Sequence, residues 1–249
     1  MNTIVTIISR KLFFNSMIRA LLEAYLKFSI STWISVKVLS IDTTSEIINA
    51  WLTIFFVVVI VGFPAFTYFF LKKYRARLEE EDFKGRFESL YLNVDTERTI
   101  ALMALFIFRR LVYAANIVFF AGSTILQIFV QFFCCLLMLL FFTYIHPMNQ
   151  PFLNRMEMFN EVCLLICSYF LFAFTDFVPD ANTRYMYGWA FIGVAVFNIG
   201  CNWCALFYKV YLAVRYMIRK FLYERRIKKY LEAKELKAAS MAPTGTIQT

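Results

Sequence analysis

The residues of this chain that could do chemistry are charged side chains next to, or inside, long apolar segments. Arg109 and Arg110 stand immediately before Leu111 to Ile145, which is a run of thirty-five residues without a charge. Glu157 and Glu161 precede another apolar run. A charge at the centre of a membrane helix costs about 2.5–3.5 kcal/mol on insertion scales, so such groups pair with one another or line ion pathways. These residues therefore indicate ion-pair or ion-pathway chemistry.

The spacing of these charges predicts one ion pair. A second crossing that begins near Phe106 would hold both arginines about 5–6 Å inside it, and a fourth crossing from about Met158 would hold Glu161 at a similar depth. Adjacent residues of a helix point about 100° apart, so the two arginines cannot both face one partner. We expect one of the two, with Arg110 slightly favoured, to form an ion pair with Glu161 and the other to reach the lipid headgroups. The alternative is that both arginines only extend to the headgroups.

Amide side chains form a second set of candidates. Gln127 and Gln131 share one helix face, and so do Asn198 and Asn202, because each pair is four residues apart. Asn116 lies in the second crossing. In lipid such amides make hydrogen bonds between helices or contact water. They therefore predict either interhelical hydrogen bonds or, in the sharper hypothesis, a polar pathway for ions or a small solute.

Two acidic residues lie where the fourth crossing ends. Asp176 and Asp180 could form an outer mouth that attracts cations, or they could cap the short turn in which they lie. Oxygen ligands with this loose spacing are a weak calcium signal, so we expect no metal site.

No constellation of catalytic residues is visible. The single histidine, His146, stands beside Pro147, where it is typical of a helix cap, and the chain has no phosphate-binding loop or nucleophile elbow. All six cysteines fall in apolar segments, where they behave as small packing residues. Cys201 and Cys204 form a C-x-x-C without a companion pair. We expect no enzyme activity and no cofactor.

The composition places these residues in a membrane. Hydrophobic residues make up 61% of the 249 residues, and the net charge is +9. Such values are typical of an all-α, polytopic transmembrane helical bundle rather than a soluble domain. The basic residues cluster beside apolar segments, which indicates contact with anionic lipid headgroups and not with nucleic acid. No cleavable signal peptide is expected, because the apolar piece near the start is short and precedes its basic residues.

About five crossings are predicted, preceded by residues 1–49 with an amphipathic, interfacial helix that lies on the membrane surface or against the bundle. A sixth crossing within residues 17–41 is possible but disfavoured by its charges and serines. The bundle occupies residues 50–214, with a kink expected at Pro64 in the first crossing. The crossings are Ala50 to Leu71, Phe106 to Ser123, Ile125 to Ile145, Val162 to Thr175 extended to Glu161 and Asp176, and Tyr185 to Tyr208.

Residues 215–249 should form a basic cytoplasmic helix and a disordered tail from Ala238. The helix would lie on anionic headgroups, or it would serve coupling or oligomerisation. With five crossings, twenty lysines and arginines lie on one side and only Arg184 lies in the turns of the other. The basic side should therefore be cytoplasmic or its equivalent, which leaves residues 1–49 on the opposite side.

A family resemblance rests on several of these features. A basic loop leads to Arg109, a helix bearing Gln127 ends at Pro147, and the motifs N-R-M-E-M-F-N-E from Asn154 and F-T-D from Phe174 follow. This pattern resembles the TRP-like C-terminal membrane domain of fungal flavin-carrier and polycystin-like proteins and of large ciliate surface proteins. The resemblance implies a channel-like bundle with a role in cation, especially calcium, movement or membrane-stress sensing. Such proteins carry further upstream regions, so the chain looks like the C-terminal piece of a longer protein.

The leading hypothesis is therefore a multi-pass membrane domain within an ion-conducting or membrane-sensing assembly. The alternative is a non-conducting structural subunit or anchor of a larger membrane complex. Both predict an oligomer or a larger complex in a bilayer, and neither identifies the organelle.

Overall fold

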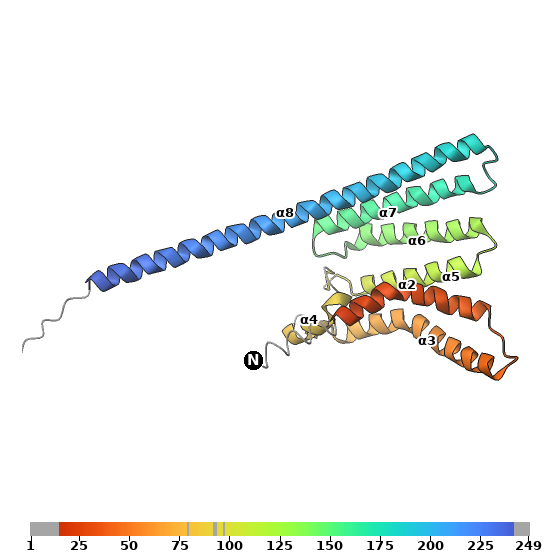
Figure 1. The fold of residues 1–249 in the computed structure, drawn as a ribbon, viewed down its shortest axis with the longest axis horizontal. Coiled ribbons are helices and arrows are strands. Elements are labelled where there is room, and N and C mark those ends of the chain that lie inside the picture. Colours follow the sequence, from red (N-terminus) through yellow and green to blue (C-terminus); the bar gives the residue numbers. More distant parts are fainter. Residues whose placement is uncertain (1–14, 79, 92–93, 97, 242–249) are drawn as a thin grey trace, which may run out of the picture. The chain divides into compact units, whose positions relative to one another are not determined.

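The structure is a computed structural model that describes residues 15–78, 80–91, 94–96 and 98–241 (Figure 1). These residues are helical, apart from loops and one isolated antiparallel bridge between Val94 and Met148. The described long helices are α2 (Ser16–Lys37), α3 (Thr44–Lys73), α5 (Ala101–Phe119), α6 (Thr124–Ile145), α7 (Pro151–Leu171) and α8 (Ala181–Met241). Between them lie α4 (Glu81–Phe87) and the 3₁₀ turns η2 (Arg75–Arg77), η3 (Glu88–Leu90) and η4 (Phe172–Phe174).

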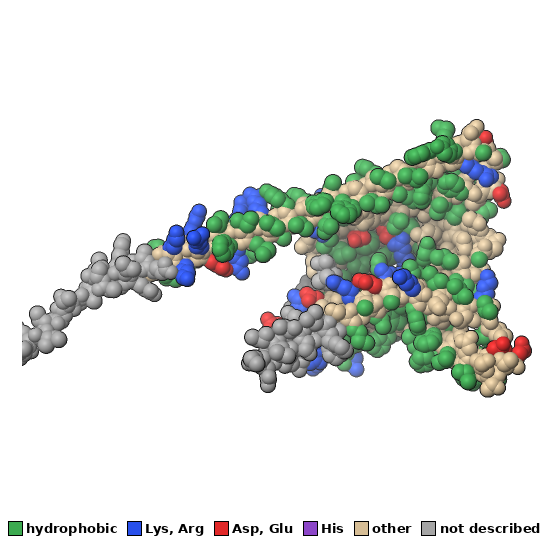
Figure 2. All heavy atoms as spheres, in the orientation of Figure 1, with side chains coloured by type: hydrophobic (Ala, Val, Ile, Leu, Met, Phe, Trp, Pro, Cys, Tyr) green, Lys and Arg blue, Asp and Glu red, His purple; other side chains and the backbone are tan. Residues whose placement is uncertain are grey.

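The described residues are all-helical, as predicted, and five of the described helices are long and apolar enough to cross a membrane, which is compatible with a multi-pass protein. They are Thr44–Lys73, Ala101–Phe119, Thr124–Ile145, Pro151–Phe174 and Ala181–Leu231. Hydrophobic side chains lie along the outside of the helices (Figure 2). Trp51 and Phe66, for example, are 71% and 62% exposed. Apolar surface on this scale is compatible with an integral membrane protein, because lipid tails would cover it.

The chain divides into two compact units, residues 1–195 and 196–249. In the first unit, α2, α3 and α5 form one group of packed helices, and α6 and α7 form an antiparallel pair (Figure 1). The second unit is the remainder of α8, which continues as one helix to Met241. Residues 242–249, most of the predicted tail, lie outside the described residues.

The helices that contain the second and fourth predicted crossings begin before those crossings do. α5 begins at Ala101 instead of Phe106, and α7 begins at Pro151 instead of near Met158. Proline suits the first position of a helix, because its ring fixes a helical φ and the missing N–H has no partner there in any case. The amide of Ala101 is bonded to Thr99 Oγ1 at 3.1 Å. Charges and amides in the early turns therefore belong to the helices and not to the preceding loops.

The α2 helix packs along α5 and α3. Its buried residues Tyr25, Ser29 and Thr32 recur at helical spacing and form the face that meets these helices. At its C-terminal end, Lys37 Nζ donates to the carbonyl of Val118 at 3.3 Å, near the end of α5. α2 therefore runs parallel to α5, with its own last turn beside the last turn of α5.

A proline in α3 explains one contact of α2. Pro64 lies inside the helix and has no N–H, so the carbonyl of Ile60, four residues earlier, lacks its usual helical donor. The hydroxyl of Tyr25 donates to this carbonyl at 2.6 Å. Figure 1 shows α3 bending along its length, as expected for a helix that contains proline.

The start of α2 lies beside the basic segment between α3 and α5. Asn15, just before α2, accepts a hydrogen bond from the backbone N–H of Ser89 at 2.9 Å. Ser89 belongs to the basic segment between α3 and α5, so residue 15 lies at the same end of the bundle as that segment. The sequence predicted residues 1–49 on the opposite side. We call the end with the basic segment the basic end, and the end with the α5–α6 turn the far end. Residues 1–14 lie outside the described residues.

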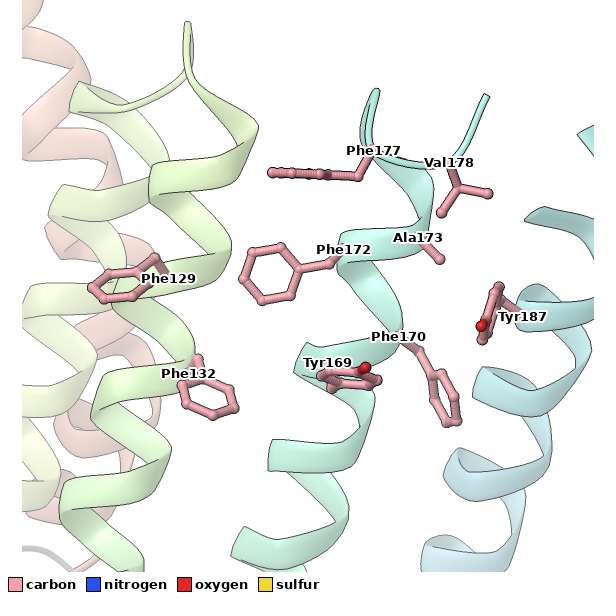
Figure 3. A pocket seen from close by; sticks show the side chains of 9 residues that line it. All are labelled: Phe129, Phe132, Tyr169, Phe170, Phe172, Ala173, Phe177, Val178 and Tyr187. Carbon is pink, nitrogen blue, oxygen red and sulfur yellow. The ribbon is translucent and has the colours of Figure 1, made fainter. Parts of the chain in front are cut away.

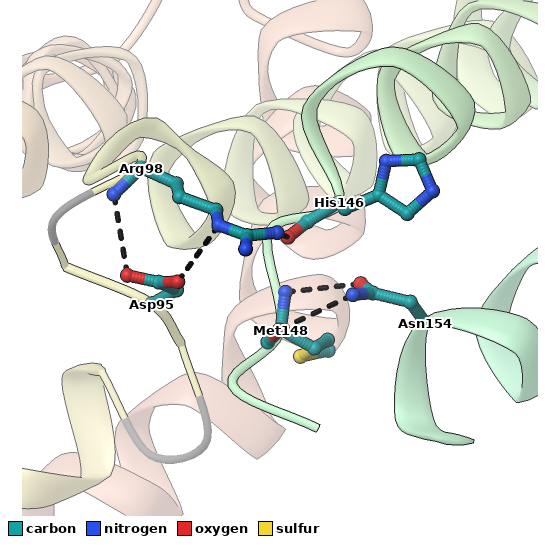
Figure 4. Close-up of polar contacts among 5 residues, drawn as sticks. All are labelled: Asp95, Arg98, His146, Met148 and Asn154. Carbon is teal, nitrogen blue, oxygen red and sulfur yellow. Dashed lines mark hydrogen bonds and ion pairs between the residues drawn. The ribbon is translucent and has the colours of Figure 1, made fainter. Parts of the chain in front are cut away.

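Polar contacts hold the loops of the basic end together (Figure 4). Arg98 pairs with Asp95 at 3.0 Å and donates to the carbonyl of His146 at 3.5 Å. His146 is the C-cap of α6 in a left-handed conformation, which agrees with its prediction as a helix cap. The buried amide of Asn154 bonds to both the N–H and the carbonyl of Met148, at 3.0 and 3.2 Å. The loops before α5 and after α6 are thereby fixed to the start of α7.

Candidate functional site

The candidate site is a charged network that joins the middles of three helices. Arg109 lies in α5, Cys135 in α6 and Glu161 in α7. Helix geometry places Arg109 about 12 Å from the start of α5 and about 15 Å from its end. Glu161 is about 15 Å from each end of α7 by the same rise per residue. The three side chains therefore meet halfway along helices of membrane-spanning length.

Hydrogen bonds connect these side chains directly. Arg109 Nη1 donates to Glu161 Oε1 in an ion pair, and Arg109 Nη2 donates to Cys135 Sγ at 3.3 Å. Gln131 Nε2 donates to the same sulfur at 3.5 Å. The Cys135 side chain is completely buried, and Glu161 is 5% exposed. The network thus places a positive and a negative charge inside the bundle, with a polarisable sulfur between two donors.

One oxygen of this network has no donor among the described residues. Glu161 Oε2 is buried and unpartnered, although a carboxylate has about four acceptor positions. A buried polar group without a partner costs about 1–3 kcal/mol, and more when it is charged. Arg109 therefore satisfies only one of the two carboxylate oxygens of Glu161 among the described residues.

One of the two arginines pairs with Glu161, as predicted, but the choice of Arg110 as the favoured partner is wrong. Arg109, not Arg110, forms the ion pair. Arg110 donates to the carbonyl of Leu22 in α2, and its guanidinium lies 4.6 Å from the ring centroid of Phe106. The 100° between adjacent residues explains the difference, because α2 packs on one face of α5 and α7 lies at another. The prediction that the second arginine reaches headgroups is also wrong, since a neighbouring helix satisfies it.

The predicted depth of the pair is wrong as well. The expectation of about 5–6 Å assumed that α5 begins at Phe106. Because α5 begins at Ala101 and α7 at Pro151, both charges move from the helix ends to the helix centres. Glu157, the other acidic candidate, lies one turn before Glu161 on α7.

The predicted amide residues do not form one polar pathway but make separate hydrogen bonds near their own positions. Asn116 Nδ2 donates to the carbonyl of Gln127 at 2.9 Å, and Gln127 Nε2 donates to the carbonyl of Ile117 at 3.2 Å. These bonds join α5 to α6 across their turn, as interhelical hydrogen bonds would. Asn202 Nδ2 donates to the carbonyl of Asn198, at 2.9 Å, within α8 in the second unit. Of the four predicted pathway residues, the structure connects only Gln131 to the charged network.

Of the two residues of the predicted acidic mouth, Asp180 caps the start of α8. Asp180 precedes α8 and accepts hydrogen bonds from the N–H of Thr183 at 2.9 Å and from its hydroxyl at 2.5 Å. These bonds hold the pKa of the Asp180 carboxyl below its ordinary value. Asp176 is exposed. Among the described residues no group of three or more potential metal ligands comes together.

Sequence reasoning missed Cys135, which was interpreted as a packing residue. Its signal was positional, because Gln127, Gln131 and Cys135 recur every four residues and therefore share one face of α6. Comparisons of the chain with protein-family models, curated proteins and solved structures found no match.

Proposed function

We propose that this chain is a multi-pass membrane domain that contributes to an ion-conducting or membrane-sensing assembly. The observation that carries the proposal is the Arg109–Glu161 ion pair at the midpoints of α5 and α7. An Arg at a helix centre costs about 2.5–3.5 kcal/mol on insertion scales, and ionisable residues at this depth usually belong to ion pathways, proton relays or sensors. The polar contacts of Cys135 and Gln131 extend this centre into α6.

Packing supports a role for this centre in coupling two parts of the first unit. α5 packs extensively on α2 and α3, and α6 packs extensively on α7, but α5 and α6 share fewer contacts. The charged network bridges the two groups at mid-height. A change at Glu161 would therefore alter both the charge inside the bundle and the contact between its two halves.

Flux through reconstituted protein tests the proposal. The full chain is placed in liposomes, and uptake of K⁺ and Ca²⁺ is measured for the wild type, Glu161→Gln and Glu224→Gln. Glu224 is a matched control, because it pairs with Lys220 at 3.9 Å on the exposed part of α8. We expect cation uptake by the wild type and the Glu224 variant and a strong reduction in the Glu161 variant. Absence of uptake by the wild type at every protein density, including densities at which it oligomerises, would overturn the conducting role.

A non-conducting structural subunit is the second candidate function. The bonds of Asn116 and Gln127 favour it, because these amides are used in holding α5 to α6 and are not left to line a pathway. This candidate predicts that the chain, purified alone, aggregates until its partner is added. A stable, monodisperse preparation without partners would contradict it.

We also propose that α2 is a sixth crossing. It runs parallel to α5 and contacts that helix from Leu22 to Lys37. If α5 crosses a membrane, a helix along the same length must cross it too. Of its charged residues, Lys37 reaches a backbone carbonyl at the far end, whereas Glu23 and Lys27 are exposed near the middle of the helix and would need to be covered by a partner or to extend toward water. Arg19, in the first turn of α2, would then lie on the basic side, in agreement with the positive-inside rule.

Accessibility to a membrane-impermeant maleimide tests this topology. Ser16→Cys and Lys84→Cys should react from one side of the membrane, and Ser40→Cys should react from the other. Labelling of residues 16 and 40 from the same side would exclude the sixth crossing without affecting the flux experiment.

A further inference from the structure

The first unit has an apolar groove at its far end, with a volume of about 330 Å³ (Figure 3). α6 contributes Phe129 and Phe132, the end of α7 and η4 contribute Tyr169 and Phe172, and Phe177 lies in the turn that follows. The ring of Phe172 points toward α6, and Phe177 extends above it (Figure 3). The volume is at the lower end of the range of about 300–1,000 Å³ that is typical of small-molecule sites. The groove is too small for a helix but large enough for a slender apolar chain.

An arginine is fixed at the rim of this groove. Arg184, in the first turn of α8, donates through Nε to the carbonyl of Val178, which lines the groove. In the described part of the chain no acidic side chain forms an ion pair with Arg184, and the nearby Asp180 carboxylate is bonded to Thr183. The two terminal amino groups of the guanidinium therefore remain to bind an anion, in the fork geometry that suits phosphate.

Aromatic residues beside Arg184 indicate its height in a membrane. Tyr185 and Trp189 are 67% and 60% exposed, and their ring centroids are 6.2 Å apart. Exposed Tyr and Trp at a helix end are typical of the headgroup level of a bilayer. Arg184 would lie at that level. Phe132 is eight residues, or about 12 Å, beyond Thr124, where α6 begins at the far end of the bundle. The groove would therefore extend into the hydrocarbon layer.

We infer that this groove binds one phospholipid of the far-side leaflet, with an acyl chain against the aromatic rings and the phosphate on Arg184. The inference rests on the proposed membrane placement of the helices but not on ion conduction. A phospholipid fits both parts of the site, because its apolar chain and its anion are separated along the membrane normal as the groove and Arg184 are. A polar solute does not fit, because the rings that line the groove offer few hydrogen-bonding groups.

Photo-crosslinking of the full chain in nanodiscs tests the inference. The probe is a phosphatidylglycerol with a diazirine in its acyl chain, and mass spectrometry locates the adducts. A diacylglycerol with the same chain is the phosphate-free probe. We expect phosphatidylglycerol adducts to concentrate on Phe129, Phe132 and Tyr169. Arg184→Gln should weaken occupancy about ten- to hundredfold, the loss expected for charge-assisted hydrogen bonds. Arg155→Gln, an exposed arginine on α7 at the basic end, should leave occupancy unchanged.

A second variant fills the groove without touching Arg184. Ala173→Phe should remove the adducts, because Ala173 is 7% exposed and lines the groove. Adducts spread evenly over the lipid-facing helices would overturn the site. Equal labelling by diacylglycerol and phosphatidylglycerol, or no effect of Arg184→Gln, would overturn the role of the phosphate. If the wild type conducts no cations but still forms phosphatidylglycerol adducts in the groove, the result counts against the proposed function and leaves the lipid site intact.

Discussion

The ion pair between Arg109 and Glu161 gives the most direct test of the structure. Glu161→Leu leaves a buried guanidinium without its counter-charge, and removing one partner of a buried pair typically costs about 3–5 kcal/mol. The double variant Arg109→Met, Glu161→Leu leaves neither charge, and replacement of a whole buried pair by apolar residues is often neutral. We therefore expect each single variant to lower the free energy of unfolding by about 3–5 kcal/mol and the double variant to lose much less.

The measurement is a double-mutant cycle on unfolding by steric trapping in bicelles. The coupling energy should exceed about 2 kcal/mol, which is above the maximum of about 1.7 kcal/mol measured for hydrogen bonds between membrane helices. Arg110→Met combined with Glu161→Leu is the matched control, because Arg110 is adjacent in sequence but bonds to Leu22 in α2. Its coupling with Glu161 should be near zero. Additive effects of the Arg109 and Glu161 variants, or a larger coupling for Arg110, would refute the pairing.

Two further predictions follow from local contacts. Tyr25→Phe removes the only hydroxyl that reaches the Ile60 carbonyl among the described residues, so it should cost about 1–3 kcal/mol of unfolding free energy. Pro64→Ala in that background should recover part of the loss, because it restores a helical N–H; no recovery would show that the proline is not the reason for the contact. The pKa of Asp180 is lowered by Thr183, so its cap stabilises α8 fully above the unfolded value of about 3.9 and is lost as pH falls through the lower folded value. The protection factor against hydrogen exchange in the first turn of α8 should therefore fall below about pH 4 in the wild type but not in Asp180→Asn, whose cap does not titrate.

The sequence was sufficient to predict the helical class and the apolar spans. Long uncharged runs determine these features directly, and the third crossing was placed within one residue at its start, because Ser123 and His146 bound it clearly. The fourth crossing was misplaced, because the criterion counted uncharged residues. α7 contains Arg155, Glu157 and Glu161 and still forms one helix from Pro151. A hydropathy average over neighbouring residues does not include distant partners, so it does not detect that Glu161 is paired with Arg109 of another helix.

The orientation of side chains around α5 was also beyond the sequence. Arg109 and Arg110 have the same chemistry, and only the positions of α2 and α7 around the helix decide which arginine meets Glu161. For α2 the sequence left two positions open, on the membrane surface or against the bundle, and in the structure the helix packs on α3 and α5. Its charges and serines resemble a surface helix, but Ser29 and Thr32 are buried against neighbouring helices. A hydropathy scale predicts that a polar residue is exposed, although a contact with a neighbouring helix can bury it.

The adjacent arginines give α5 a particular position in the bundle. Through Arg110 it is fixed to the backbone of α2, and through Arg109 it is fixed to a charge on α7. The two contacts differ in kind. Arg110 bonds to a neutral backbone carbonyl, whereas Arg109 is held to Glu161 by the attraction of two opposite charges. The α2–α5 contact is therefore suited to a permanent support. The α5–α7 contact is the one through which a change of charge inside the bundle would alter the packing of helices.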